Sequence, residues 1–178
     1  QAGGFVRTRP DLDRPNIQLY FSPVSYRKAP PGTRPLMNPD PFPAFLTSIS
    51  QCRPTSRGLL RLRSADPMAA PEIQPNYLAT EHDLQENLEG MRFMRRLTAT
   101  PSMRALIAEE EAPGPAVEDD AALIAYIRET GVTVFHPTST CRMGPDPRDN
   151  VVDPTLRVHG LDGLRVADAS IFPTIPSG

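Results

Sequence analysis

The hydrophobic pattern before residue 65 has a period of two, which is typical of β-strands. Residues 1–8 are a short strand-like opening, and polar and apolar positions alternate from Asn16 to Val24, as expected for a strand with one buried face. Residues 44–54 alternate in the same way. In residues 58–64, Leu60 and Leu62 fall on one face and Arg61 and Arg63 on the other. These segments predict an antiparallel sheet with one side in water.

A proline-rich stretch interrupts this pattern. Residues 27–43 include "KAPPGTRPLMNPDPFP", which is too dense in proline for a helix or for a central strand. We expect a surface loop there.

The period changes to that of a helix after Tyr77. Thr80, with Asp83 three positions later, is a plausible N-cap. The apolar residues that follow recur at helical spacing and predict an amphipathic helix of about 18 residues with its stripe in the core: Leu84, Leu88, Met91, Met94 and Leu97.

Two more helices are expected before residue 132. A short one follows Pro101 and ends by the "PGP" of residues 113–115, and another runs from Asp119 to Thr130 with Gly131 as its C-cap. Strands followed by helices predict an α+β fold, in which an antiparallel β-sheet carries its helices on one face.

Composition limits the possible partners. The 19 Lys and Arg against 21 Asp and Glu give a net charge of −2, which argues against binding to nucleic acid or to anionic lipid. The chain has no apolar run near the roughly 20 residues that a membrane span requires, and its first residues lack the layout of a signal peptide. Cys52 and Cys141 supply neither a disulfide framework nor the spacing of a metal site, and they mildly favour the reducing cytoplasm.

The segment "VFHPTSTCRMG" contains one of only three histidines. The β-branched and aromatic residues 132–135 predict a short strand, and Pro137 restricts His136 to an extended backbone at the end of that strand. A histidine held in this way has the fixed orientation that proton transfer requires. The alternative is an ordinary buried histidine that is bonded to a carbonyl.

Four blocks that include this segment follow one another in order: "HPTSTCRMG", "VVDPTLRVHG", "GLRVADAS" and "PTIPSG". Together with the upstream "RPTSRGLLRLRSADPMAAPEIQPNYL", they resemble the C-terminal part of the glucose–methanol–choline (GMC) family of flavin-dependent oxidoreductases, a group that includes choline dehydrogenase and aryl-alcohol oxidase. The resemblance implies that residues 1–150 form a substrate-binding domain. It also implies that residues 151–178 return to an α/β FAD-binding domain.

The resemblance also implies roles for individual residues. His136 matches the catalytic base, which takes the hydroxyl proton of an alcohol while a hydride passes to N5 of the flavin of FAD. Val134 and Phe135 should line the substrate pocket, although they could equally be plain strand core.

A second predicted strand, residues 164–167, ends at Asp168. By resemblance, Asp168 and Ala169 contact FAD, whereas the alternative role of Asp168 is to cap the following turn.

Arg142 either orients a loop or pairs with Asp146. Cys141 is expected to be buried packing, and His82 and His159 are assigned no function.

Two departures from the family pattern suggest that the sequence is a piece of a longer enzyme. It contains no G-x-G-x-x-G after a strand, and it stops at Gly178, where the family continues with an Asn or His. The expected partners are therefore a small alcohol substrate and the missing FAD-binding part of the same enzyme. Besides an alcohol dehydrogenase or oxidase, a lyase on the same scaffold and a non-catalytic binding domain remain open.

Overall fold

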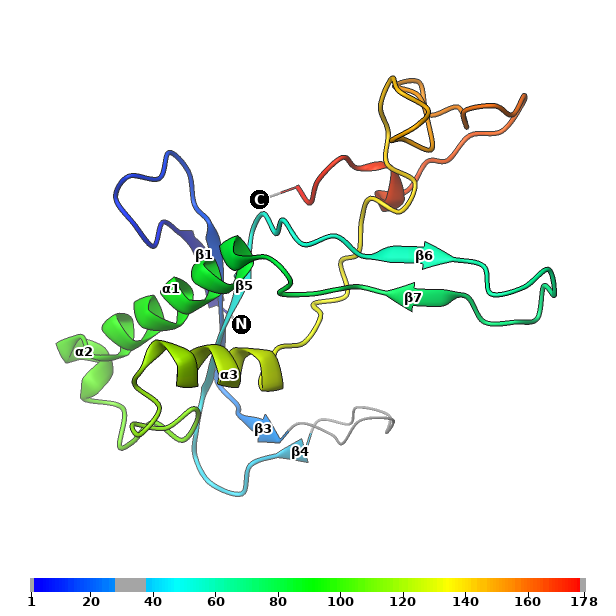
Figure 1. Ribbon diagram of the computed structural model, residues 1–178. Coiled ribbons are helices and arrows are strands. Elements are labelled where there is room, and N and C mark those ends of the chain that lie inside the picture. Colours follow the sequence, from blue (N-terminus) through cyan, green and yellow to red (C-terminus); the bar gives the residue numbers. More distant parts are fainter. Residues whose placement is uncertain (1, 28–37, 177–178) are drawn as a thin grey trace. The chain divides into compact units, whose positions relative to one another are not determined.

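A computed structural model describes residues 2–27 and 38–176 and forms two compact units (Figure 1). The first unit comprises Gln1–Gln51 and Glu86–Ile127, and the second comprises Cys52–Gln85 and Arg128–Gly178. Most of the expected proline-rich loop lies outside the described residues. At its two ends, β3 (Tyr26–Arg27) and β4 (Asn38–Pro39) pair as a short antiparallel ladder. The domain division expected at residue 150 stays a prediction.

The first unit is built on the antiparallel sheet that the sequence predicts. Its strands are β1 (Ala2–Val6), β2 (Ile17–Ser22) and β5 (Leu46–Gln51), in the order β1-β2-β5. Ile17 stands opposite Val6 on one side and Gln51 on the other, and its side chain is fully buried. All three predicted strands are thus confirmed, but burial does not alternate along them, because residues 2–5 of β1 are all exposed and β2 is at least half-buried throughout.

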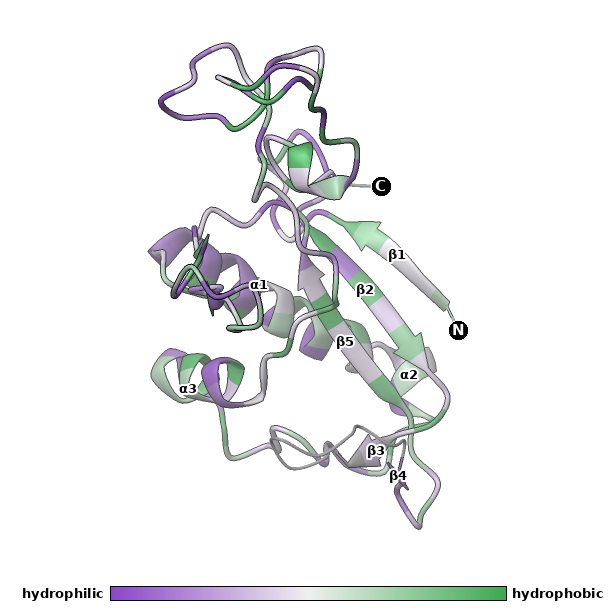
Figure 2. Ribbon diagram, turned by 90° about the vertical axis from the view of Figure 1, so that its right-hand side faces the viewer, coloured by the Kyte–Doolittle hydropathy of each residue, from purple (hydrophilic) through white to green (hydrophobic). Residues whose placement is uncertain are grey.

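The long helix packs against this sheet (Figure 2). Helix α1 spans Glu81–Thr98, and Thr80 caps it as predicted, because its Oγ1 accepts a hydrogen bond of 3.3 Å from the backbone N of Asp83. At Gly90 a Cβ atom would lie 2.6 Å from Cδ1 of Ile49, so the missing side chain lets the helix approach the sheet closely. The predicted core stripe is confirmed for Leu84, Leu88 and Met94, which are buried, but it is wrong for Leu97, which is 36% exposed at the end of the helix.

The remaining helices are short. Helix α2 spans Pro101–Arg104, and α3 spans Asp120–Thr130 with Leu123 and Ile127 buried. Asp119 caps α3 by accepting a hydrogen bond of 2.8 Å from the backbone N of Ala122. The structure thus contains the predicted α+β elements. Within residues 2–27 and 38–176, no helix has the length and apolar character that a membrane crossing needs.

The second unit begins with a two-stranded antiparallel hairpin. Strands β6 (Leu59–Arg61) and β7 (Glu72–Gln74) pair, and Arg61 and Glu72 form a cross-strand ion pair of 2.7 Å. The predicted strand is confirmed, but its predicted buried leucine face is wrong, because Leu60 is 49% exposed and Leu62 83%. An alternating strand buries one face only where another layer covers it.

A buried carboxylate fixes the chain that leads into this hairpin. Asp83 in the first turn of α1 is 1% exposed and accepts hydrogen bonds from the backbone N atoms of Thr55 (2.7 Å) and Ser56 (2.9 Å). Burial by itself would raise the pKa of Asp83, but the hydrogen bonds from Ser56 and Thr55 outweigh it and hold the pKa well below its ordinary value.

We therefore expect the stability that Asp83 contributes to depend on pH. Because its folded pKa is depressed, the contribution is complete above the pKa of the unfolded chain and is lost as pH falls through the folded value. Asp83→Asn should lower the free energy of unfolding at pH 7 by about 2 kcal/mol, and the difference from wild type should shrink below pH 4 or so. Thermal unfolding from pH 7 to pH 2 measures this, with the exposed Glu81→Gln as the control that shows little effect. An Asp83→Asn deficit that is independent of pH would contradict the assignment.

Candidate functional site

The segment that carries His136 is irregular and has no strand, so the strand predicted for residues 132–135 is wrong. The physical reason lies at Phe135, whose φ of 60° places it in the left-handed region, which an extended strand cannot include. The Phe135 backbone N donates a hydrogen bond of 3.0 Å to Oγ1 of Thr133. This local turn takes the place of the sheet edge that was expected to hold the histidine.

His136 is exposed to solvent and does not belong to the core. Its side chain is exposed, and no residue in the described part of the chain hydrogen-bonds to its imidazole. The alternative of a buried histidine bonded to a carbonyl is therefore wrong for His136. It describes His159 instead, a half-buried residue whose Nε2 lies 3.0 Å from the backbone oxygen of Gly144.

The two residues expected to line the substrate pocket are exposed as well. Val134 is 44% exposed and Phe135 is 80% exposed, so neither is strand core. The segment thus presents an imidazole directly after two solvent-exposed apolar side chains. This combination can contact the apolar part of a small molecule and exchange a proton with its polar part.

Asp168 caps a short turn at the second predicted site. Its Oδ1 accepts a hydrogen bond of 2.8 Å from the backbone N of Ser170, which starts the 3₁₀ helix η1 (Ala169–Ile171). Hydrogen bonds from the Ser170 side chain and backbone lower the pKa of Asp168, so it is a carboxylate at neutral pH. The capping role is confirmed, whereas the strand predicted for residues 164–167 is wrong. Only Arg165 makes a bridge there, with Arg157.

Backbone hydrogen bonds join the histidine segment to the Asp168 segment. The backbone N of Cys141 donates to the oxygen of Ser170, and that of Met143 donates to the oxygen of Ile171, both at 2.9 Å. Residues 141–143 are also tied to the fully buried Val152 through Gly144, whose N donates to the Val152 oxygen at 2.9 Å. The structure therefore brings three of the four sequence blocks together in one unit.

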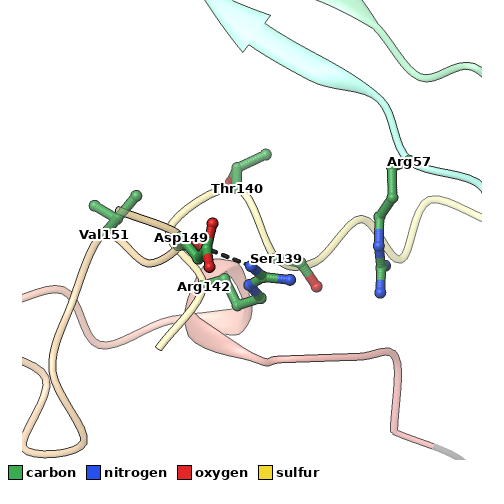
Figure 3. Close-up of a pocket in the computed structure, with 6 residues that line it drawn as sticks. All are labelled: Arg57, Ser139, Thr140, Arg142, Asp149 and Val151. Carbon is green, nitrogen blue, oxygen red and sulfur yellow. Dashed lines mark hydrogen bonds between the residues drawn. The ribbon is translucent and has the colours of Figure 1, made fainter. Parts of the chain in front are cut away.

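A hollow of about 350 Å³ lies in the second unit beside this framework (Figure 3). Among its lining residues, Arg142 donates a hydrogen bond of 2.7 Å to the backbone oxygen of Asp149, so it orients a loop. Its predicted alternative, a pair with Asp146, is wrong, because Asp146 pairs with Arg148 at 2.7 Å. Sequence reasoning missed the rest of the lining, in which Arg57 is distant along the chain and the others lie close to Arg142: Ser139, Thr140, Asp149 and Val151.

Among residues 2–27 and 38–176, no group of three or more His, Cys, Asp or Glu side chains could hold a metal ion. Neither Cys52 nor Cys141 forms a disulfide bond within the described residues; Cys52 is buried, and Cys141, expected to be buried, is half-buried.

Comparison with known proteins identifies relatives over the whole chain. The profile of the family described as GMC oxidoreductase matches residues 54–178. The chain is 40% identical to an alcohol dehydrogenase [acceptor] from Pseudomonas putida and 42% identical to an oxygen-dependent choline dehydrogenase from Pseudomonas fluorescens (strain Pf0-1). Both alignments cover 100% of this chain but only 31% and 30% of those proteins.

Solved structures show the same fold. A pyridoxine 4-oxidase from Mesorbium loti superposes with a TM-score of 0.81 at 28% identity, covering 99% of this chain and 34% of that one. A fungal aryl-alcohol oxidase gives a TM-score of 0.71 at 34% identity, covering 92% of this chain and 24% of that one. The chain thus spans about a third of the length of these relatives or less.

Proposed function

The chain belongs to the GMC oxidoreductase family, and we propose that the whole protein is an FAD-dependent enzyme that oxidises an alcohol to an aldehyde or ketone. FAD is the cofactor of the family. The observation that carries the proposal is the exposed His136, which follows two exposed apolar side chains in a segment hydrogen-bonded to the Asp168 turn.

In the proposed reaction, the alcohol loses the hydrogen of its C–H bond as a hydride and the hydrogen of its O–H bond as a proton. Bound FAD supplies the two-electron acceptor. A ring nitrogen of His136 accepts the hydroxyl proton, because a neutral imidazole has an unprotonated nitrogen with a lone pair available for this. Val134 and Phe135 contact the apolar part of the substrate and exclude water from it.

Asp168 and Ala169 fit the polyol part of FAD. The Asp168 side chain is exposed and carries a carboxylate, whose two oxygens have room for hydrogen bonds from hydroxyl groups beside those from Ser170. Ala169 is exposed and has a side chain of a single methyl group, which allows a close approach. We propose these two residues as the cofactor contacts of this chain.

The test is to add a primary alcohol to the whole FAD-loaded protein without oxygen and to record the flavin absorbance. Bleaching of the flavin with release of one carbonyl product per flavin supports the proposal. Conversion of the compound without net reduction of flavin would assign a lyase, and binding without either change would assign a non-catalytic domain.

Thr133 should act as a positioning residue for His136 in this reaction. Its Oγ1 holds the left-handed turn at Phe135, directly before the histidine, and Pro137 restricts the backbone on the other side. Thr133→Val removes the hydroxyl at constant size and should slow flavin reduction about tenfold with little change in substrate affinity. Stopped-flow reduction at varied substrate concentration separates the two effects, and Thr133→Ser, which keeps the hydroxyl, should restore most of the rate. Equal rates for the valine and serine variants would show that the turn does not orient the base.

A further inference from the structure

We propose that the hollow in the second unit is a binding site for a small ligand that carries a phosphate group, and that Arg57 and Arg142 hold this group. The site is separate from the proposed alcohol chemistry, because neither His136 nor Asp168 lines it. Its volume of about 350 Å³ lies within the usual range of small-molecule pockets.

The polar lining of the hollow consists mainly of hydrogen-bond donors. Figure 3 shows the guanidinium groups of Arg57 and Arg142 on either side of the Ser139 hydroxyl. Ser139 Oγ lies 3.0 Å from Oγ1 of Thr138, so when Thr138 donates to it the Ser139 proton can point elsewhere. Donors that converge from several side chains suit a tetrahedral anion better than a planar carboxylate, which has only two oxygens.

The guanidinium groups of Arg57 and Arg142 both have N–H groups available to bind an anion. Within residues 2–27 and 38–176, neither Arg57 nor Arg142 forms an ion pair with a carboxylate. Arg142 uses Nη2 to bond the backbone oxygen of Asp149, which fixes its side chain and leaves its other N–H groups available. Asp149 also lines the hollow, so the lining holds two positive charges and one negative charge, and its net charge favours an anion.

The backbone around the hollow is held in place before any ligand binds. The Val151 N donates a hydrogen bond of 3.0 Å to the oxygen of Arg142, and the Cys141 N between Thr140 and Arg142 is bonded to Ser170 at 2.9 Å. Arg57 follows Ser56, whose N is bonded to the buried Asp83 at 2.9 Å. A backbone that is already fixed loses less conformational entropy when a ligand binds, so this framework favours affinity.

The experiment titrates the FAD-loaded whole protein with inorganic phosphate by calorimetry, at constant ionic strength set with sodium chloride. We expect saturable binding that Arg57→Gln and Arg142→Gln each weaken about tenfold or more. Arg57→Lys keeps the charge but loses the planar fork, so it should fall between wild type and Arg57→Gln. Arg157→Gln removes an exposed arginine of the same unit that does not line the hollow, and it should bind as wild type does. Acetate should bind more weakly than phosphate.

Three results would overturn the proposal: no saturable binding to the FAD-loaded protein, equal losses in the Arg57 and Arg157 variants, or acetate binding as tightly as phosphate. Should Arg142→Gln disturb the loop at Asp149, Arg57→Gln still decides, because no hydrogen bond within residues 2–27 and 38–176 depends on the Arg57 side chain. The readout needs no turnover, so it is unaffected if the proposed alcohol oxidation fails.

Discussion

Replacing His136 with alanine should slow the reduction of the flavin by substrate about 10²-fold or more in the whole FAD-loaded protein. The imidazole is exposed and is the only titratable side chain between Val134 and Thr140. Without it, the hydroxyl proton must pass to water while the hydride leaves, and the positioned acceptor is lost. Stopped-flow absorbance under anaerobic conditions measures this rate, and His136→Gln should be impaired as well, because an amide cannot take the proton.

The matched control is His82→Ala, the same substitution at an exposed residue in the first turn of α1. It should leave the rate of flavin reduction unchanged. A primary solvent isotope effect that grows in His136→Ala would further show that proton removal has become limiting. A His136→Ala rate close to wild type would refute the role of the base.

The elements with a strong period could be predicted from the sequence. Helix α1 and its cap at Thr80 follow from apolar residues at helical spacing behind a hydroxyl residue, and both are local signals. The strands β2 and β5 likewise follow from alternation of polar and apolar residues. Such patterns report which face of an element is buried, provided that something covers that face.

The environment of the histidine could not be predicted in the same way. Residues 132–135 have the composition of a strand, but a strand also needs a neighbour to bond with, and the left-handed turn at Phe135 prevents this pairing. Pro137 restricts the backbone of His136 alone, so it does not determine the conformation of the residues before it. The feature that holds the segment is a side-chain hydrogen bond of Thr133, which local composition does not reveal.

The burial of certain polar residues could not be predicted from the hydrophobic pattern either. Asn16 and Asp83 are polar residues that the hydrophobic pattern places at the surface, yet their side chains are 0% and 1% exposed. Asn16 Nδ2 donates to Oε1 of Glu86 at 3.3 Å, and Asp83 bonds the chain at Thr55. Both contacts join residues that are distant in sequence. The hollow itself was missed for the same reason, because Arg57 and Arg142 line one hollow only in the folded chain.

Leu88→Ala should destabilise the first unit more than any other single truncation of α1. Leu88 is 0% exposed, and its helix packs on a sheet in which Ile17 is also 0% exposed. Removing its isobutyl group loses the transfer free energy of the buried carbons and leaves a cavity that close-packed neighbours fill only in part. The expected loss is about 2–5 kcal/mol in the free energy of unfolding.

Denaturant unfolding of the whole protein followed by far-ultraviolet circular dichroism measures the loss for Leu88→Ala. The control is Leu106→Ala, the same truncation in the same unit at a side chain that is 76% exposed, and its effect should stay within about 0.5 kcal/mol. Leu88→Met, which conserves volume, should cost less than about 1.5 kcal/mol. Similar losses at Leu88 and Leu106 would mean that α1 does not bury Leu88 against the sheet, and the packing of the first unit would then need to be revised. A large loss at Leu88 alone ties the stability of this unit to the apolar stripe that the sequence already predicts.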